Sequence, residues 1–223
     1  MLQPTTIKFL KDLKKNNTKE WFDKNRKLYE AAKTDFADTI QSAIDRFGKK
    51  DQSILALKAK DCVFRINRDV RFSKDKSPYK TNMGASINKA GKKAWNTAGY
   101  YFHFEPGGSF VGGGLYQPEP SILKKVRQEI DYNFEEFKKI INNKKFASSY
   151  KDLHQGTDTK LSRPPKDYEA DNPAIEYIKL KSFIAMAPIS DADLADKNLV
   201  KKITDAFEAL QPMINFLNHA SEG

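Results

Sequence analysis

Residues 64–72 alternate between apolar and polar side chains, a period that predicts a β-strand. Successive side chains of a strand point to opposite faces, so one face carries the apolar set Phe64, Ile66, Val70 and Phe72. Arg68 breaks the pattern because it falls on that same face. Burying a guanidinium costs on the order of several kcal/mol unless a carboxylate or a carbonyl pairs with it. We therefore expect Arg68 either to have an acidic partner or to line an open face that holds an anion.

Periodicity along the rest of the chain predicts about five strands and several helices. The strands cover about residues 62–72, 82–88, 99–105, 109–116 and 182–187, and short connections favour antiparallel pairing of the first four. Apolar residues at helical spacing predict helices over about 5–13, 18–47, 121–142 and 198–219, and Asn172-Pro173 opens a short one. The predicted fold class is α+β. It is a single domain over residues 1–223, with a central, mainly antiparallel sheet packed by N- and C-terminal helices.

Positive charge is concentrated in one part of the chain. The formal net charge is +10, and residues 58–93 hold eleven Lys and Arg against three Asp, a local net charge of +8. The remaining 28 basic and 26 acidic residues are nearly balanced, at +2. A localised excess favours one patch with an anionic partner, either a small molecule or a nucleic acid. The alternative is a solvated surface whose charges are neutralised by nearby acids.

The basic stretch supplies the candidate ligand-binding residues, which are Arg65, Arg68, Asp69, Arg71, Lys74, Lys76 and Lys80. Asp69 is expected to neutralise Arg65 or Arg71, its neighbours on the same face. The candidate proton donors are Tyr79, Tyr101 and His103, since a phenol or an imidazole can move a proton. The aromatic residues that could offer stacking planes to a nucleic acid are Phe72, Tyr79, Trp95, Tyr100 and Tyr101.

Two functions of different classes fit these residues. The first is a binding module for a phosphorylated or other anionic ligand, because Arg planes match phosphate oxygens. The second is an enzyme acting on an anionic substrate, in which the same cations stabilise developing negative charge. A third interpretation is a purely structural network of ion pairs. The charge concentration is visible and a catalytic constellation is not, so the binding module is preferred.

Several other classes find no support in the sequence. Cys62 is the only cysteine, so no intrachain disulfide can form, which favours a reducing cytoplasm. His103, His154 and His219 lie far apart, and no zinc spacing or other metal motif is present. Gly112 to Gly114 is not followed by Lys-Ser or Lys-Thr, so no P-loop and no cofactor are expected. No apolar run approaches the roughly 18 residues of a membrane span. The sequence indicates no oligomeric state.

Several motifs together carry a resemblance to a known family. They are the long segment 64–82, Asn16-Asn17 with Trp21-Phe22, Tyr100-Tyr101, Gly112-Gly113-Gly114, Arg163-Pro164-Pro165 and Lys179-Leu180-Lys181-Ser182-Phe183. The chain resembles, over about residues 9–217, a family of uncharacterised proteins known only as a domain of unknown function, DUF2461. The resemblance implies one compact domain. It assigns no catalytic residue, cofactor or partner.

Overall fold

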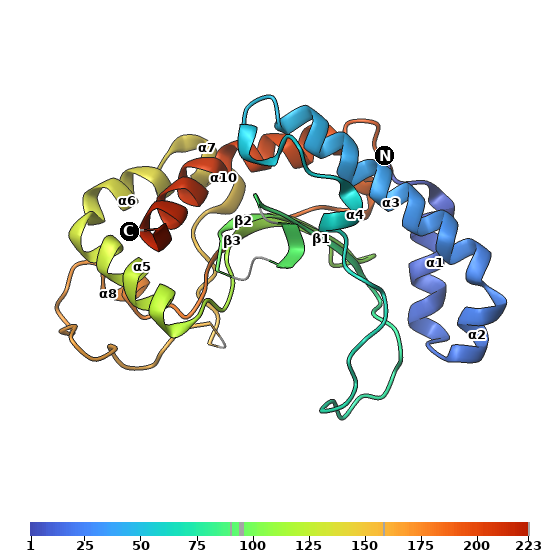
Figure 1. Cartoon of the computed structure of the whole chain (residues 1–223), viewed down its shortest axis with the longest axis horizontal. Helices are drawn as coiled ribbons and strands as arrows, with labels where there is room; N and C mark the ends of the chain where they lie inside the picture. The colour runs from blue at the N-terminus through green and yellow to red at the C-terminus, as the bar shows by residue number, and fades with distance from the viewer. Residues whose placement is uncertain (90, 94–95, 158, 223) are drawn as a thin grey trace. The chain divides into compact units, whose positions relative to one another are not determined.

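The computed structural model describes residues 1–89, 91–93, 96–157 and 159–222 (Figure 1). Within these ranges the chain forms ten α-helices and one antiparallel sheet of four strands. The helices are α1 Pro4–Lys15, α2 Lys19–Lys24, α3 Arg26–Phe47, α4 Ala59–Cys62, α5 Pro120–Tyr132, α6 Phe134–Ile141, α7 Lys144–Tyr150, α8 Ile175–Ile178, α9 Asp191–Leu194 and α10 Leu199–Glu222. The strands are β1 Met83–Ile87, β2 Gly99–Phe104, β3 Phe110–Leu115 and β4 Phe183–Pro188, in the order β1-β2-β3-β4. The α+β class is confirmed.

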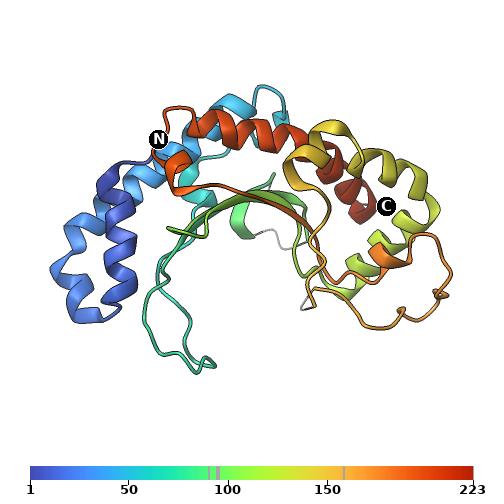
Figure 2. The same ribbon diagram turned by 180° about the vertical axis from the view of Figure 1, so that it is seen from behind.

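The prediction of about five strands is wrong by one, because residues 62–72 do not form a strand. This stretch makes only two isolated antiparallel bridges, Val63 with Ala85 and Asn67 with Tyr79. Between the bridges, three residues on one side of the ladder oppose five on the other, so the ladder cannot run without interruption. We call residues 63–82 the basic arm. In Figure 1 and Figure 2 the arm is a long loop that extends away from β1.

Helix ends follow local chemistry that the sequence predicts only in part. Thr18 caps α2 as expected, since its hydroxyl accepts a hydrogen bond from the Trp21 N–H at 3.2 Å. The predicted helix over 18–47 is divided at Asn25, whose side-chain amide donates to the Trp21 carbonyl at 2.8 Å. Gly48 ends α3 as predicted. The predicted helix over 121–142 is likewise divided, at Asn133.

Contacts group the chain into two compact units. Unit 1 comprises Met1–Ile87, Tyr101–Val111 and Pro188–Asp205, and unit 2 comprises Asn88–Tyr100, Gly112–Ala187 and Ala206–Gly223. In unit 1, Phe36 stacks on Phe102 and Phe104 at 5.9 and 6.2 Å between ring centroids. In unit 2, Tyr100 packs against Phe207 at 4.8 Å. The single domain over residues 1–223 stays a prediction.

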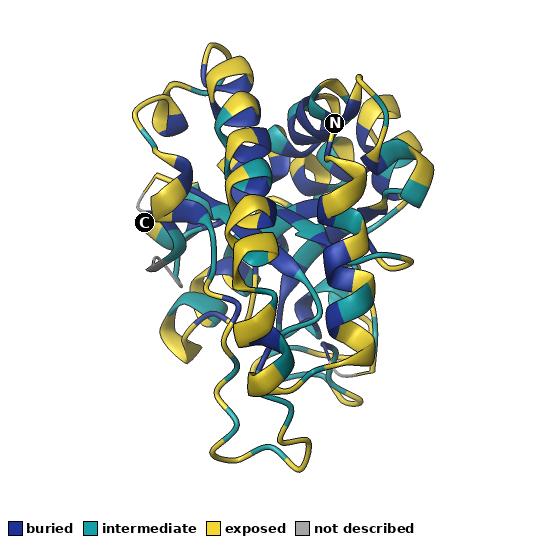
Figure 3. Cartoon of the chain, turned by 90° about the vertical axis from the view of Figure 1, so that its right-hand side faces the viewer, coloured by how far each residue is buried: buried dark blue, intermediate teal, exposed yellow. Residues whose placement is uncertain are grey.

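Burial separates the two faces of the secondary-structure elements. Helices show buried residues on one side and exposed residues on the other (Figure 3). The expected alternation of β2 is confirmed, with Tyr100, Phe102 and Phe104 fully buried and Tyr101 and His103 half-buried on the opposite face. None of the described helices is long and apolar enough to cross a membrane. The half-buried face of β2 and the basic arm, both in unit 1, hold the candidate site residues.

Candidate anion-binding site

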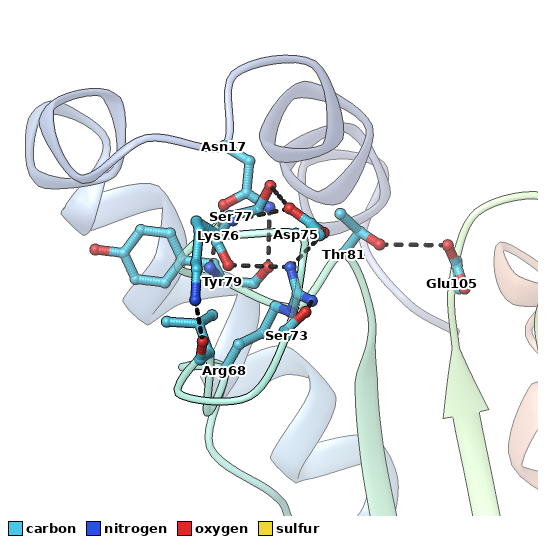
Figure 4. Close-up of polar contacts among 10 residues, drawn as sticks. Asn17, Arg68, Ser73, Asp75, Lys76, Ser77, Tyr79, Thr81 and Glu105 are labelled. Atoms are coloured by element: carbon cyan, nitrogen blue, oxygen red, sulfur yellow. Dashed lines mark hydrogen bonds and ion pairs between the residues drawn. The ribbon is translucent and has the colours of Figure 1, made fainter.

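The basic arm is anchored at Tyr79, on its returning side. The Tyr79 ring stacks on Phe22 of α2 at 3.9 Å between centroids and is buried. Asn17 binds both backbone groups of Tyr79, accepting from its N–H at 3.1 Å and donating to its carbonyl at 2.9 Å (Figure 4). Burial raises the pKa of the Tyr79 hydroxyl. Tyr79 thus holds the arm in place, and its ring points away from the polar contacts of the arm (Figure 4).

Arg68 organises the turn of the arm. Its guanidinium binds the Asp75 carboxylate, the Ser77 carbonyl at 3.1 Å and the Ser73 hydroxyl at 3.3 Å (Figure 4). Asp75 also accepts from the Ser77 N–H at 2.9 Å and hydroxyl at 2.7 Å. These Ser77 bonds, followed by Arg68, lower the pKa of Asp75 to about 2. The acidic-partner alternative for Arg68 is therefore the one the structure shows.

Two more of the predicted cations have partners within the arm. Arg71 binds Asp69 through two hydrogen bonds, Nε to Oδ1 at 2.9 Å and Nη2 to Oδ2 at 2.6 Å. Asp69 therefore forms its hydrogen bonds with Arg71 and not with Arg65, and these bonds, with a smaller effect of the Arg65 charge, lower the pKa of Asp69. Lys76 donates to the Val70 carbonyl at 3.0 Å. These contacts leave part of the predicted cluster internally satisfied, as the structural interpretation proposed.

Arg65, Lys74 and Lys80 differ from the others, since none of their side chains forms an ion pair or a hydrogen bond with a described residue. Lys80 is half-buried, and its ammonium lies 5.6 Å from the centroid of the Phe64 ring. Burial, and then the nearby charge of Arg65, lower the pKa of Lys80. Arg65 is exposed. Arg65 therefore lies close enough to two ionisable groups of the arm to act on both, since its charge also lowers the pKa of Asp69.

A row of three polar side chains lies on the half-buried face of β2 and its end. The Tyr101 hydroxyl is 3.3 Å from Nδ1 of His103, and Nε2 of His103 is 3.4 Å from the Glu105 carboxylate. Oε1 of Glu105 also accepts hydrogen bonds from the Lys14 ammonium and from the Thr81 hydroxyl, each at 3.4 Å. Burial raises the pKa of Tyr101 to about 12 and lowers the pKa of His103, against the opposing effect of Glu105. Both side chains are therefore uncharged at neutral pH.

Gly84 makes room for this row. A Cβ atom at this position would lie 2.4 Å from the Tyr101 hydroxyl oxygen, closer than side-chain contacts allow. The phenol therefore rests directly over the backbone of β1. The centroids of the Phe64 and Tyr101 rings lie 6.5 Å apart. The ammonium of Lys80 lies over the same Phe64 ring. The row and the Arg65–Lys80 pair thus share one aromatic neighbour.

Sequence reasoning placed Tyr101 and His103 on one strand face but missed three residues that complete the site. Lys14, Asn17 and Gly84 contact it from α1, from the loop before α2 and from β1. None carries a local signal, because each acts through a contact distant in sequence. Among the expected stacking residues, Tyr79 and Tyr100 are buried, whereas Phe72 is 95% exposed. Trp95 lies outside the described residues.

The architecture and the site define an α+β protein whose basic arm adjoins a Tyr–His–Glu row. The chain belongs to the family of conserved hypothetical proteins DUF2461, whose model matches residues 5–216. The resemblance read from the sequence motifs is therefore confirmed. No curated protein and no solved structure matches the chain. The described residues contain no group of three or more His, Cys, Asp or Glu that could hold a metal ion.

Proposed function

We propose that this protein binds a phosphorylated or other anionic ligand through the cations of the basic arm whose side chains have no ion pair or hydrogen bond among the described residues, Arg65, Lys74 and Lys80. The observation that carries the proposal is the half-buried Lys80 ammonium, whose pKa is lowered by burial and by Arg65. Two like charges held near each other destabilise the unliganded protein. An anion between them would remove that repulsion and supply the missing hydrogen-bond acceptors.

The rest of the arm favours binding because it fixes these cations in place. Asn17 and Phe22 hold the returning side of the arm at Tyr79, and Arg68 with Asp75 closes the turn. A site that is already ordered loses less conformational entropy when a ligand binds. The ion pairs that satisfy Arg68 and Arg71 therefore act as supports, while Arg65, Lys74 and Lys80 are the contacts we assign to the ligand.

The neighbouring row adds neutral hydrogen-bonding groups to the charged ones. With the His103 imidazole uncharged and Nε2 facing Glu105, the arrangement has the proton on Nε2 and leaves Nδ1 to accept from the Tyr101 hydroxyl. The Tyr101 oxygen keeps a lone pair for a ligand hydroxyl. A ligand with both a phosphate and a hydroxyl group would use both parts of the site.

Titration with inorganic tripolyphosphate at low ionic strength tests the proposal by calorimetry. Arg65→Ala and Lys80→Met should each weaken binding by about tenfold, because each removes one charge-assisted contact worth about 1.4 kcal/mol. Lys49→Met is the matched control, since Lys49 is exposed, lies beyond α3 and also loses one positive charge. Absence of binding at low salt, or equal losses in all three variants, would show that the proposal is wrong.

A second candidate function is an enzyme that acts on the bound anion, and the row of Tyr101, His103 and Glu105 is the observation that favours it. The carboxylate orients the imidazole, and the imidazole contacts a phenol, which together form a path along which a proton can move. The raised pKa of Tyr101 and the lowered pKa of His103 oppose proton transfer between them in the unliganded protein. Binding therefore ranks first.

Hydrolysis of a chromogenic phosphate monoester tests the second candidate. His103→Gln should reduce turnover by about 10² to 10⁴ if the imidazole takes part in proton transfer. Tripolyphosphate binding by the same variant should be unchanged, because Arg65 and Lys80 remain. If the wild-type protein binds the anion and shows no turnover, the enzymatic candidate is rejected and the binding module stands.

A further inference from the structure

Phe72 is the most exposed large hydrophobic residue of the described chain. Its exposed fraction is 95%, and it lies in the basic arm between Asn67 and Ser77, beyond the bridge of Asn67 with Tyr79. The arm turns through hydrogen bonds of Arg68, Asp75 and Ser77, so the ring is displayed on an ordered support. A fully exposed phenyl ring gains nothing from folding, because no apolar surface is buried. The ring is therefore accessible for stacking on a partner.

The surroundings of Phe72 define the charge of that partner. The guanidinium of Arg71, which is paired with Asp69, lies 5.8 Å from the centre of the Phe72 ring, and Lys74 follows two residues later without an ion pair to a described carboxylate. Arg65 and Lys80 continue the positive charge toward β1. From residue 65 to residue 72 the arm spans at most roughly 23 Å, at ~3.3 Å per extended residue. An aromatic plane and a line of cations therefore occupy one narrow element.

We propose that the arm binds single-stranded nucleic acid, with one base stacked on Phe72 and the phosphates along Lys74, Arg65 and Lys80. This inference rests on the proposed function, and it names the ligand class. Aromatic planes combined with backbone-tracking cations are the means by which proteins hold unpaired strands without sequence preference. A duplex keeps its base faces stacked inside and offers no plane to Phe72.

A membrane carrying anionic lipids would also attract these cations, but the arm is poorly suited to it. Stable association with a bilayer needs a broad apolar face or more than one anchor. Phe72 is a single ring, and its neighbours Arg71, Ser73 and Lys74 are polar or charged. A lone planar ring among cations is better matched to a base than to an acyl-chain layer.

Fluorescence anisotropy with labelled oligomers tests the inference on the full chain. The probes are an oligothymidylate of about 12 nucleotides, within the site sizes of single-strand binders, and an abasic oligomer of equal length. Wild-type protein should bind the oligothymidylate more tightly. Phe72→Ala should weaken that binding by about 5- to 150-fold, the effect of losing one base stack. It should leave binding of the abasic oligomer unchanged.

Two further variants separate stacking from general hydrophobic contact. Phe72→Leu keeps an apolar side chain without a plane, so it should resemble Phe72→Ala. Phe72→Trp should retain the affinity, and its added fluorescence should be quenched by the oligothymidylate. Because Phe72 is 95% exposed, none of the three substitutions should shift the unfolding midpoint in urea.

Salt provides an independent measure of the phosphate contacts. Each contact contributes about −0.7 to the slope of log affinity against log salt for single strands, so three cations give about −2. Affinity should therefore fall about 20-fold between about 50 and 200 mM salt. Arg65→Ala should make the slope shallower by about 0.7.

The outcomes separate this inference from the proposed function. If both oligomers bind equally and Phe72→Ala changes neither, the stacking role is wrong while anion binding stands. If neither oligomer binds but tripolyphosphate does, the nucleic-acid assignment alone is overturned. If no anion binds, both fail. Binding only to vesicles of anionic lipid, retained by Phe72→Leu, would reassign the arm to a membrane surface.

Discussion

Asn17→Ala isolates the anchoring of the basic arm from its charge. The substitution removes two hydrogen bonds to the backbone of Tyr79, at 2.9 and 3.1 Å, and leaves every cation and the Tyr79–Phe22 stack in place. Each lost bond costs about 0.5 to 1.5 kcal/mol, so the arm should lose about 1 to 3 kcal/mol of local stability. This loss arises without any change in net charge.

Native-state amide hydrogen exchange measures that loss where it occurs. The informative amides are those of Arg68 and Lys80, which donate to the Pro78 and Ile66 carbonyls across the arm at 2.9 and 2.8 Å. A loss of 1 to 3 kcal/mol raises their exchange rates by about 5- to 150-fold when opening is local. Tripolyphosphate affinity should fall as well, because the cations are no longer held in one arrangement.

Asn17→Asp is the matched variant. It keeps an acceptor for the Tyr79 N–H and loses only the donor to the Tyr79 carbonyl, so its exchange rates should lie between those of the wild type and those of Asn17→Ala. Asn16→Ala is the control, since its side chain binds only the Asp12 carbonyl at the end of α1. If Asn17→Ala leaves both arm amides as protected as in the wild type, Asn17 does not hold the arm and the argument from preorganisation is refuted.

Three other predictions concern the same unit. Gly84→Ala should lower the free energy of unfolding of unit 1 by about 1 to 3 kcal/mol in urea, because the new Cβ would lie 2.4 Å from the phenol oxygen of Tyr101. The displaced phenol should also lose its 3.3 Å contact with His103, and unchanged ¹⁵N shifts of the His103 imidazole would contradict this. The lowered pKa of His103 means that the unfolded chain binds the proton more readily, so stability should fall as pH drops below 6.5, and His103→Gln should flatten that part of a melting-temperature profile. Tyr79→Leu should lower the free energy of unfolding in urea by about 1 to 3 kcal/mol, because it removes the stack on Phe22. Tyr79→Phe keeps the ring and should lower it by less than about 1 kcal/mol; equal losses in the two variants would show that the hydroxyl, not the ring, stabilises the arm.

Much of the fold could be predicted from the sequence because its signals are local. The alternation of β2 is set by the two-residue period of a strand, and it correctly placed His103 opposite Phe102. Thr18 and Gly48 mark helix ends through their own backbone and side-chain preferences. The concentration of charge in residues 58–93 is likewise a property of the sequence itself.

The predicted first strand failed because alternation shows which side chains share a face but not whether a partner strand continues the ladder. In the structure the opposing side of the arm contains two extra residues between its bridges, and Arg68 turns toward Asp75. That mismatch depends on where residues 80–84 lie. No pattern within residues 62–72 contains this information.

The sequence by itself determined the α+β class, the strand face of β2 and the presence of a basic stretch, since each follows from neighbours along the chain. Only the tertiary structure decided which cations have acids of their own, which aromatic ring is exposed and which remote residues reach the site. Charge neutralisation and burial depend on distances between residues far apart in sequence. Asn17 holds the backbone of Tyr79, 62 residues further along the chain, for this physical reason.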